Sequence, residues 1–264
     1  MGLIALTRPV PASIAACELT HVSRQPIDIP RAVAQHEAYE AALRSLGVDV
    51  RRLAPAPSLP DSVFIEDTAV VLPEVAIVTL PGAASRRPEI VAVEEALLPF
   101  RRVARVQWPG TMDGGDVLVV PQVRAIFVGL SSRTNQEGIQ QFRNIVEPLG
   151  YRVEMVIMRN CLHLKSAATQ IAPLDEPPLL LVNPAWLPEN AFLGIRHLPI
   201  HPNEPYAANA IRVGRALLHA TQFTLTRHLL HCHGIRVTSV DNDELAKAEG
   251  ALTCCSLLFD APTV

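Results

Sequence analysis

The sequence has few of the features that mark nucleic-acid-binding or membrane proteins. Its 23 basic residues are outnumbered by 26 acidic ones, so it lacks the excess of Lys and Arg that nucleic acid requires. No apolar run approaches the roughly 18 residues of a membrane span, and the N-terminus reads as a strand from Leu3 to Leu6 and not as a leader. We therefore expect a soluble, cytoplasmic protein with no nucleic-acid or membrane partner.

Cysteine is sparse, and its pattern excludes a disulfide framework. The five cysteines are an odd number, scattered without CxxC spacing, and reduced thiols agree with a cytoplasmic location. Two of them, Cys254 and Cys255, are adjacent in an apolar, strand-like run that follows Gly250. Cys254 is a candidate nucleophile, and His163, also flanked by strand-like residues, is the best candidate for the base that a nucleophile needs.

Lysine is almost absent. Of the 23 basic residues only Lys165 and Lys247 are lysine, and they lie two residues after His163 and three residues before Gly250. This placement is a weak indication that arginine cannot replace lysine there, with chance as the alternative.

Carboxylates are present close to apolar segments of the chain. Asp61, Glu66 and Asp67 form one group, and Asp113 and Asp116 form another around Gly114-Gly115. One thiol, one imidazole and several acids together favour a cationic substrate.

Composition and length predict one folded domain over residues 1–264. The chain is 49% hydrophobic and 19% charged, enough apolar surface for a full core. Gly47, Gly150 and Gly234 each follow a helical stretch and precede an alternating strand, as C-terminal helix caps do. Further joints between a helix and the following strand are expected before Val103 and near residues 195–200. These joints recur about every 40 to 55 residues, which predicts a repeated supersecondary unit, and five such units fill the chain.

The expected elements alternate between strand pairs and helices. Strand pairs are predicted at 68–72 with 75–80, 116–120 with 124–130, and Ile171 with 179–182; helices are predicted at 30–46, 88–98, 134–149 and 221–233. A closed ring of such α/β units would place the turns after the strand ends around one central cavity.

Six segments, in order and over nearly the whole chain, resemble the dimethylarginine dimethylaminohydrolases. Each segment alone is weak evidence for the family, but six segments in the same order are strong evidence. They are 60–71 (PDSVFIEDTAVV), 81–87 (PGAASRR), 113–118 (DGGDVL), 129–135 (GLSSRTN), 162–166 (LHLKS) and 252–256 (LTCCS). The resemblance implies the pentein fold, a five-bladed α/β propeller of repeated ββαβ units around a central active-site cavity.

The resemblance also implies roles for individual residues. Cys254 would be the nucleophile, His163 the proton shuttle, and Asp113 the acid that orients His163 and contacts the guanidinium; capping of the Gly114-Gly115 turn is the alternative for Asp113. Cys255 is then expected in the core, since neighbouring strand positions face opposite sides. The implied substrate contacts are Asp67 with Glu66 for the guanidinium, Arg86 and Arg133 for the carboxylate, Asp61 and the backbone of Leu19 for the α-amine, and Ala248 at the mobile flap.

The implied activity is hydrolysis of Nω-methylated L-arginine to L-citrulline and methylamine or dimethylamine through a covalent thiouronium intermediate. No cofactor and no metal are expected, and a homodimer is possible. Because a free thiol has a pKa of about 8.5, we expect the bound guanidinium to assist ionisation of Cys254.

Two alternatives stay open at this point. One is arginine deimination or amidino transfer within the same superfamily, although the chain length argues against the larger deiminases. The other is a non-catalytic thiol and histidine site for zinc. A separate group on the helix before Gly234, namely His228, His231, Cys232 and His233, offers no convincing set of four ligands and favours an amphipathic or surface helix.

Overall fold

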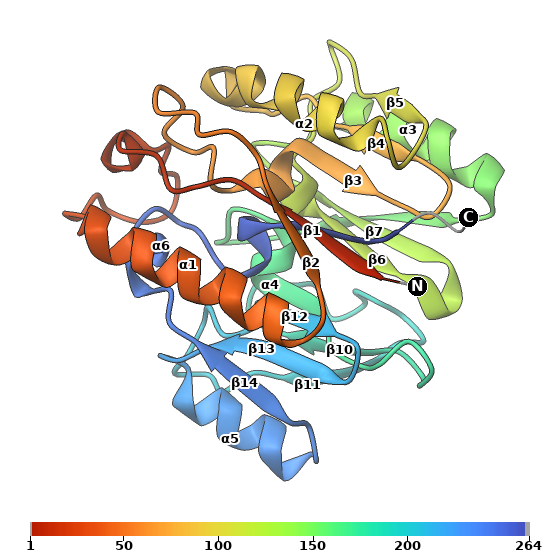
Figure 1. Ribbon diagram of the computed structural model, residues 1–264. Helices are drawn as coiled ribbons and strands as arrows, with labels where there is room; N and C mark the ends of the chain where they lie inside the picture. The colour runs from red at the N-terminus through yellow and green to blue at the C-terminus, as the bar shows by residue number, and fades with distance from the viewer. Residues whose placement is uncertain (1, 262–264) are drawn as a thin grey trace.

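The computed structural model describes residues 2–261, which form five three-stranded sheets arranged around a common centre (Figure 1). In every sheet a first strand pairs antiparallel with a central strand, and the central strand pairs parallel with a third. Parallel neighbours need a crossover connection, which a helix supplies in four of the five sheets. The predicted five-bladed propeller of ββαβ units is confirmed.

The sheets are β15-β1-β2, β3-β4-β5, β6-β7-β8, β11-β10-β9 and β12-β13-β14. The strands are β1 (Leu3–Thr7), β2 (Asp49–Arg52), β3 (Ala69–Val71), β4 (Ala76–Val78), β5 (Val103–Arg105), β6 (Val117–Val120), β7 (Ala125–Leu130), β8 (Arg152–Ile157), β9 (Ala168–Gln170), β10 (Leu179–Val182), β11 (Arg196–Pro199), β12 (Ala210–Val213), β13 (Ala216–Ala220), β14 (Val237–Val240) and β15 (Leu257–Asp260). The helices are α1 (Ile29–Ser45), α2 (Ile90–Leu97), α3 (Gln136–Val146), α4 (Leu164–Ala167), α5 (Thr224–Cys232) and α6 (Asp243–Ala246).

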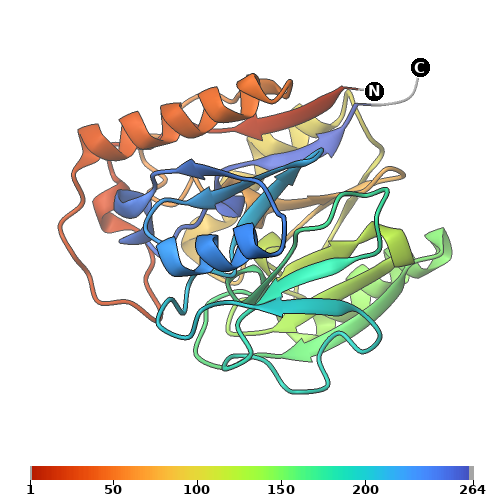
Figure 2. The same cartoon turned by 90° about the horizontal axis from the view of Figure 1, so that it is seen from below.

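Pairing of β15 with β1 closes the ring. Leu3 lies opposite Asp260 and Leu6 opposite Leu257, so the first and last strands of the chain share one sheet and lie side by side (Figures 1 and 2). The first strands of the units also meet each other, β9 with both β6 and β12, and β15 with β3. These strands therefore form the inner wall of the propeller.

The helix ends follow the local signals in the sequence. Gly47, Gly150 and Gly234 all have left-handed backbone, with φ of +83°, +87° and +74°, which confirms the three glycine joints. At the other end, the Asp28 side chain accepts a hydrogen bond from the Arg31 amide and begins α1. Helix α2 begins at Ile90 and not at Pro88, because Ala84–Glu89 forms a 3-10 segment first. None of the helices within residues 2–261 has the length and apolarity needed to cross a bilayer.

Each long helix packs across the seam between its own sheet and the preceding one. A helix residue and a strand residue of the neighbouring sheet share a buried cluster in all four cases. The pairs are Leu43 of α1 with Leu218 of β13, Leu97 of α2 with Leu6 of β1, Phe142 of α3 with Ile77 of β4, and Leu230 of α5 with Leu181 of β10.

The fourth unit departs from the prediction. Its first strand, β9, ends at Gln170, so Ile171 lies just beyond the strand to which we assigned it. A helix-to-strand joint was expected near residues 195–200, but no helix precedes β11. The turns between β10 and β11 instead bury Phe192, whose ring makes an edge-to-face contact with Phe127 of β7 at 4.8 Å between centroids. Phe192 thus fills the seam that a helix covers elsewhere.

Replacing Phe192 with alanine should destabilise the protein by about 3–5 kcal/mol, the usual cost of removing a buried phenylalanine. Phe192 is 3% exposed, whereas its neighbour Leu193 is 72% exposed. Leu193→Ala is therefore the matched control, and it should change the free energy of unfolding very little. Urea unfolding of the two variants tests this, and equal losses would show that Phe192 does not replace the helix.

Candidate active site

The candidate residues come from turns that directly precede the inner strands. Asp67 lies in the 3-10 turn Ile65–Thr68 before β3, and Asp113 precedes the 3-10 turn Gly114–Asp116 before β6. His163 precedes the short helix α4 before β9, and Cys254 lies in the 3-10 turn Thr253–Cys255 before β15. We expected strands around His163 and Cys254, but the apolar residues that suggested strands belong to a short helix and a buried turn.

The Gly114-Gly115 pair permits close approach of these turns. A Cβ atom at Gly115 would lie 2.6 Å from His163 Nδ1 and 2.7 Å from Asp67 Oδ1, and one at Gly114 would lie 2.1 Å from the Glu66 carbonyl oxygen. Any larger residue would push the turns apart. Asp113 does not cap this turn with its side chain, so the alternative role for Asp113 is wrong.

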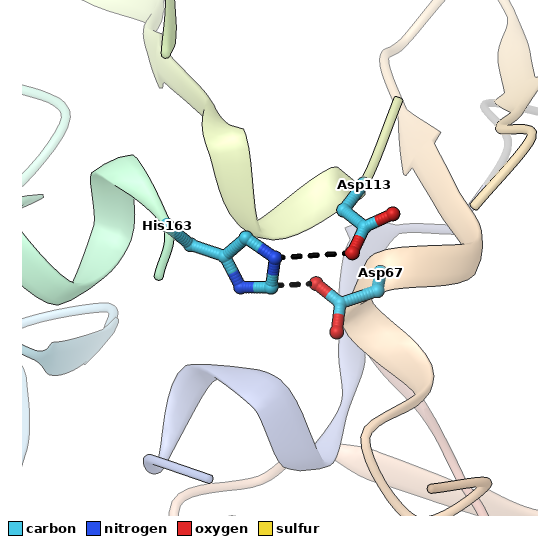
Figure 3. Close-up of side chains that lie close together, drawn as sticks. All are labelled: Asp67, Asp113 and His163. Atoms are coloured by element: carbon cyan, nitrogen blue, oxygen red, sulfur yellow. Dashed lines mark hydrogen bonds and ion pairs between the residues drawn. The ribbon is translucent and has the colours of Figure 1, made fainter. Parts of the chain in front are cut away.

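His163 lies between two carboxylates (Figure 3). Its Nε2 is 3.1 Å from Asp113 Oδ2 and its Nδ1 is 3.6 Å from Asp67 Oδ1. Burial alone would lower the pKa of His163, but Asp67, the hydrogen bond with Asp113 and the nearby Asp116 outweigh it and raise this pKa to about 9. The imidazole is therefore protonated at neutral pH and has a proton to donate.

Asp67 stays ionised although it is buried. Burial would raise its pKa, but His163 and Arg86 together with the amide of Gly115 lower it to about 2. Arg86 Nη1 is 2.5 Å from Asp67 Oδ2, and the Gly115 amide donates to Asp67 Oδ1 at 3.0 Å. Asp113 accepts a further hydrogen bond from the Gly82 amide at 2.9 Å.

The two cysteines of the pair have different surroundings. Cys254 is half-buried and lines the same cavity as His163, Asp67 and Asp113. Burial, followed by the nearby carboxylates of Glu66 and Asp67, raises the pKa of the Cys254 thiol above its ordinary value. Cys255 is fully buried in the core, as predicted, with its thiol 3.4 Å from the Ala251 carbonyl oxygen. Without a ligand, Cys254 is a neutral thiol at physiological pH.

The cavity wall is rich in acids. Its residues are Glu18, Asp61, Phe64, Asp67, Arg86, Asp113, Arg133, Leu162, His163, Ala248, Glu249, Gly250 and Cys254. Eight of the ten predicted site residues are among them. The exceptions are Glu66 and Leu19.

The placement of Glu66 differs from the prediction that it helps to grip the guanidinium. Its carboxylate accepts hydrogen bonds from Lys165 Nζ at 2.6 Å and from Thr253 Oγ1 at 2.7 Å. Both oxygens are thus engaged behind the catalytic cavity. Glu66 supports the turns that carry Asp67 and Cys254 and does not contribute to the wall.

Leu19 belongs to a segment that covers one side of the cavity. Asp61 accepts the Glu18 amide at 3.2 Å and Arg133 Nη2 donates to Thr20 Oγ1 at 3.2 Å. Glu249, which was not predicted, accepts the Thr20 amide at 2.5 Å and the His21 amide at 2.7 Å. The covering segment therefore occupies Asp61 and Arg133, two residues predicted to contact substrate.

The two predicted carboxylate-binding arginines are not equivalent. Arg86 is buried and forms ion pairs with both Asp67 and Glu89. The Arg133 guanidinium also lines the cavity, but among residues 2–261 it forms no ion pair and gives one hydrogen bond, to Thr20. Arg133 is the freer of the two cations to meet an anionic group.

A second layer behind the cavity was only partly detectable from the sequence. Asp116 accepts hydrogen bonds from Ser131, Thr134 and the Leu164 amide, and burial raises the pKa of Asp116 to about 6. The scarcity of lysine pointed to Lys165, which pairs with Glu66. Asn209, which bonds Thr253 and the Lys165 carbonyl, carried no signal in the sequence.

The geometry offers one group with the spacing of metal ligands. Among the described residues, side-chain atoms of Asp67, Asp113 and His163 lie within 4.8 Å of one another. Arg86 and a protonated His163 already neutralise these carboxylates, which favours a charge network over a cation site. The histidines near the end of α5 form no such group among the residues that the structure describes, although Cys232 Sγ lies 3.6 Å from His228 Nε2.

Comparisons with known proteins agree with this geometry. The family model described as "N,N dimethylarginine dimethylhydrolase, eukaryotic" matches residues 20–166. The chain is 40% identical over 256 residues to the N(G),N(G)-dimethylarginine dimethylaminohydrolase of Streptomyces coelicolor, covering 96% of this chain and 95% of the relative.

Solved structures share the fold over nearly the whole chain. A dimethylarginine dimethylaminohydrolase from Pseudomonas aeruginosa, a cysteine-to-serine mutant complexed with citrulline, superposes with a TM-score of 0.91 and 32% identity, covering 98% of this chain and 100% of that one. The N-terminal domain of ArgZ, a cyanobacterial arginine dihydrolase bound to its product, superposes with a TM-score of 0.86 over 99% of both chains. At 18% identity, ArgZ supports the fold alone.

We expect His163 to titrate near pH 9, and Asp113→Asn to lower its pKa by removing a bonded anion. Because its pKa is above the ordinary 6.5, the protonated ring stabilises the folded state fully below pH 6.5, and this stability is lost as pH rises through 9. Histidine NMR titration, with His163→Gln to assign the resonance, tests this. A wild-type midpoint near 6.5 would contradict it.

Proposed function

Since the chain belongs to the dimethylarginine dimethylaminohydrolase family, we propose that it hydrolyses Nω-methylated L-arginine to L-citrulline and methylamine or dimethylamine. The observation that carries this proposal is the cavity itself, in which a thiol, a protonated imidazole and the carboxylates of Asp67 and Asp113 meet. The chain covers nearly the whole length of the relatives that bear this name.

The charges of the cavity complement both ends of a cationic amino acid, the guanidinium and the α-amino acid group. Carboxylates can grip a planar guanidinium through paired hydrogen bonds, and Asp67 and Asp113 are placed to do so. Asp61 and Glu18 supply negative charge for an α-amine, and Arg133 and Arg86 supply positive charge for an α-carboxylate. Substrate must displace the hydrogen bonds that residues Glu18 and Thr20 now make with Asp61 and Arg133.

When the guanidinium binds, the Cys254 thiol releases its proton to solvent, and in the first half-reaction the resulting thiolate attacks the guanidinium carbon. The bond from this carbon to the methylated nitrogen then breaks, and His163 gives its proton to the departing amine, leaving a thiouronium on Cys254. A bound guanidinium beside the imidazolium is a like charge that lowers the pKa of His163, so substrate itself makes the ring a better acid.

In the second half-reaction His163, now neutral, takes a proton from water as the oxygen attacks the thiouronium carbon. The carbon–sulfur bond breaks, the hydroxyl proton of the adduct passes to the leaving sulfur, and citrulline and the Cys254 thiol are formed. The imidazole ends protonated, as it began, and Cys254 is free for another cycle. No step requires a further oxidant, reductant or co-substrate.

Ionisation of Cys254 should depend on the ligand. In the free protein burial and two nearby carboxylates raise the pKa of this thiol, whereas a bound guanidinium adds a cation that lowers it. We therefore expect thiolate ultraviolet absorbance to increase at neutral pH when a non-hydrolysed guanidinium ligand is added, with Cys254→Ala as the blank. An unchanged titration with ligand would refute substrate-assisted ionisation.

Two other activities remain to be tested against this one. One is arginine deimination or amidino transfer, which the sequence leaves open. A zinc-binding protein without turnover is the second, since the charge network also has metal-ligand spacing. A cytoplasmic location and a homodimer stay predictions.

Incubation with asymmetric dimethylarginine, monomethylarginine, arginine or agmatine separates these activities. We expect ureido product from the two methylated arginines and at least about a thousandfold loss in Cys254→Ala, because the nucleophile is removed. Product mainly from arginine or agmatine would identify a deiminase. No product, with near-stoichiometric zinc after purification, would favour the zinc site.

A further inference from the structure

Asn209 occupies the turn before β12, the position that carries a cavity residue in each of the other four units. Its side chain is buried, with 4% of the residue exposed, and Asn209 does not line the catalytic cavity. A buried amide requires hydrogen-bond partners, so the partners of Asn209 indicate its purpose.

All the polar atoms of the Asn209 amide are engaged. Nδ2 donates to Thr253 Oγ1 at 2.9 Å and to the Lys165 carbonyl oxygen at 3.1 Å. Oδ1 accepts the Thr253 amide at 3.1 Å. Two donors and one acceptor fix the orientation of the amide, and no carboxylate or aliphatic side chain can make the same set of bonds.

These bonds join the two turns on which the chemistry depends. Thr253 directly precedes Cys254, and Lys165 follows His163 by two residues. Thr253 Oγ1 also donates to Glu66 Oε2, and Lys165 Nζ is bonded to Glu66 Oε1. Asn209, Thr253, Glu66 and Lys165 therefore form a closed network behind the cavity.

We propose that Asn209 is a positioning residue that holds the turn of Cys254 in register with the turn of His163. The inference rests on the proposed hydrolase function. A 3-10 turn of three residues has too few internal hydrogen bonds to fix its own position. An error of about 1 Å between reacting groups can cost about a hundredfold in rate, so an external clamp has a direct effect on catalysis.

Asn209→Ala tests the proposal, and Asn183→Ala is its matched control. Asn183 is also 4% exposed, and its amide donates to the Pro205 carbonyl and accepts the Ala185 amide, away from the cavity. We expect Asn209→Ala to lower kcat at least about tenfold while KM stays within about twofold, because the substrate contacts remain. Asn183→Ala should retain kcat.

A second measurement separates positioning from a general loss of structure. Release of the turn should expose the half-buried Cys254, so its alkylation by iodoacetamide, followed by mass spectrometry, should be faster in Asn209→Ala than in Asn183→Ala. Equal kcat values in the two variants would overturn the proposal, and so would alkylation that is no faster. If the wild-type protein hydrolyses no methylated arginine, the proposed function fails, and the alkylation rates alone decide whether Asn209 holds the turn.

A variant at Thr253 serves if Asn209→Ala does not fold by circular dichroism. Thr253→Val keeps the branched shape but removes the hydroxyl that bonds Asn209 and Glu66, whereas Thr253→Ser keeps the hydroxyl. Thr253→Val should show the low kcat and fast alkylation, and Thr253→Ser should restore both toward wild type. Identical behaviour of Val and Ser would overturn the proposal.

Discussion

The buried charge network of Asp67, Asp113, His163 and Arg86 is the constraint on which the rest of the site depends. Isolated charges are costly to bury, so each of these groups requires the others. The same balance keeps His163 protonated and Asp67 ionised at neutral pH. In the proposed reaction the network supplies an acid for the leaving amine and an anionic face for a guanidinium. Burial, with Glu66 and Asp67, raises the pKa of the Cys254 thiol and keeps it neutral until a cation binds.

The propeller brings these groups together because each inner strand is preceded by a turn that points to the centre. A turn of three or four residues is a weak support by itself, and glycine at 114 and 115 lets neighbouring turns touch. The turns are then held from outside by sheets, by seam-covering helices and, in the fourth unit, by Phe192. Stability of the fold and precision of the site are therefore parts of one arrangement.

Much of the fold could be predicted from particular residues. Gly47, Gly150 and Gly234 marked helix ends because only a residue without a side chain readily adopts left-handed backbone there. The missing helix before β11 could not be predicted, since a buried Phe192 in a turn leaves no periodic pattern. Likewise, the apolar residues around Cys254 suggested a strand, because burial in a turn and burial in a strand select the same side chains.

The sequence by itself determined the repeated unit, the thiol and histidine pair, and the family to which the chain belongs, because these depend on local signals and on motif order. Only the tertiary structure decided which polar residues share a cavity. Glu66 and Asp67 are adjacent in the chain, yet one supports the turns from behind and the other faces His163. Asn209 carries no motif at all, and its three hydrogen bonds exist only because folding brings three distant turns to one centre.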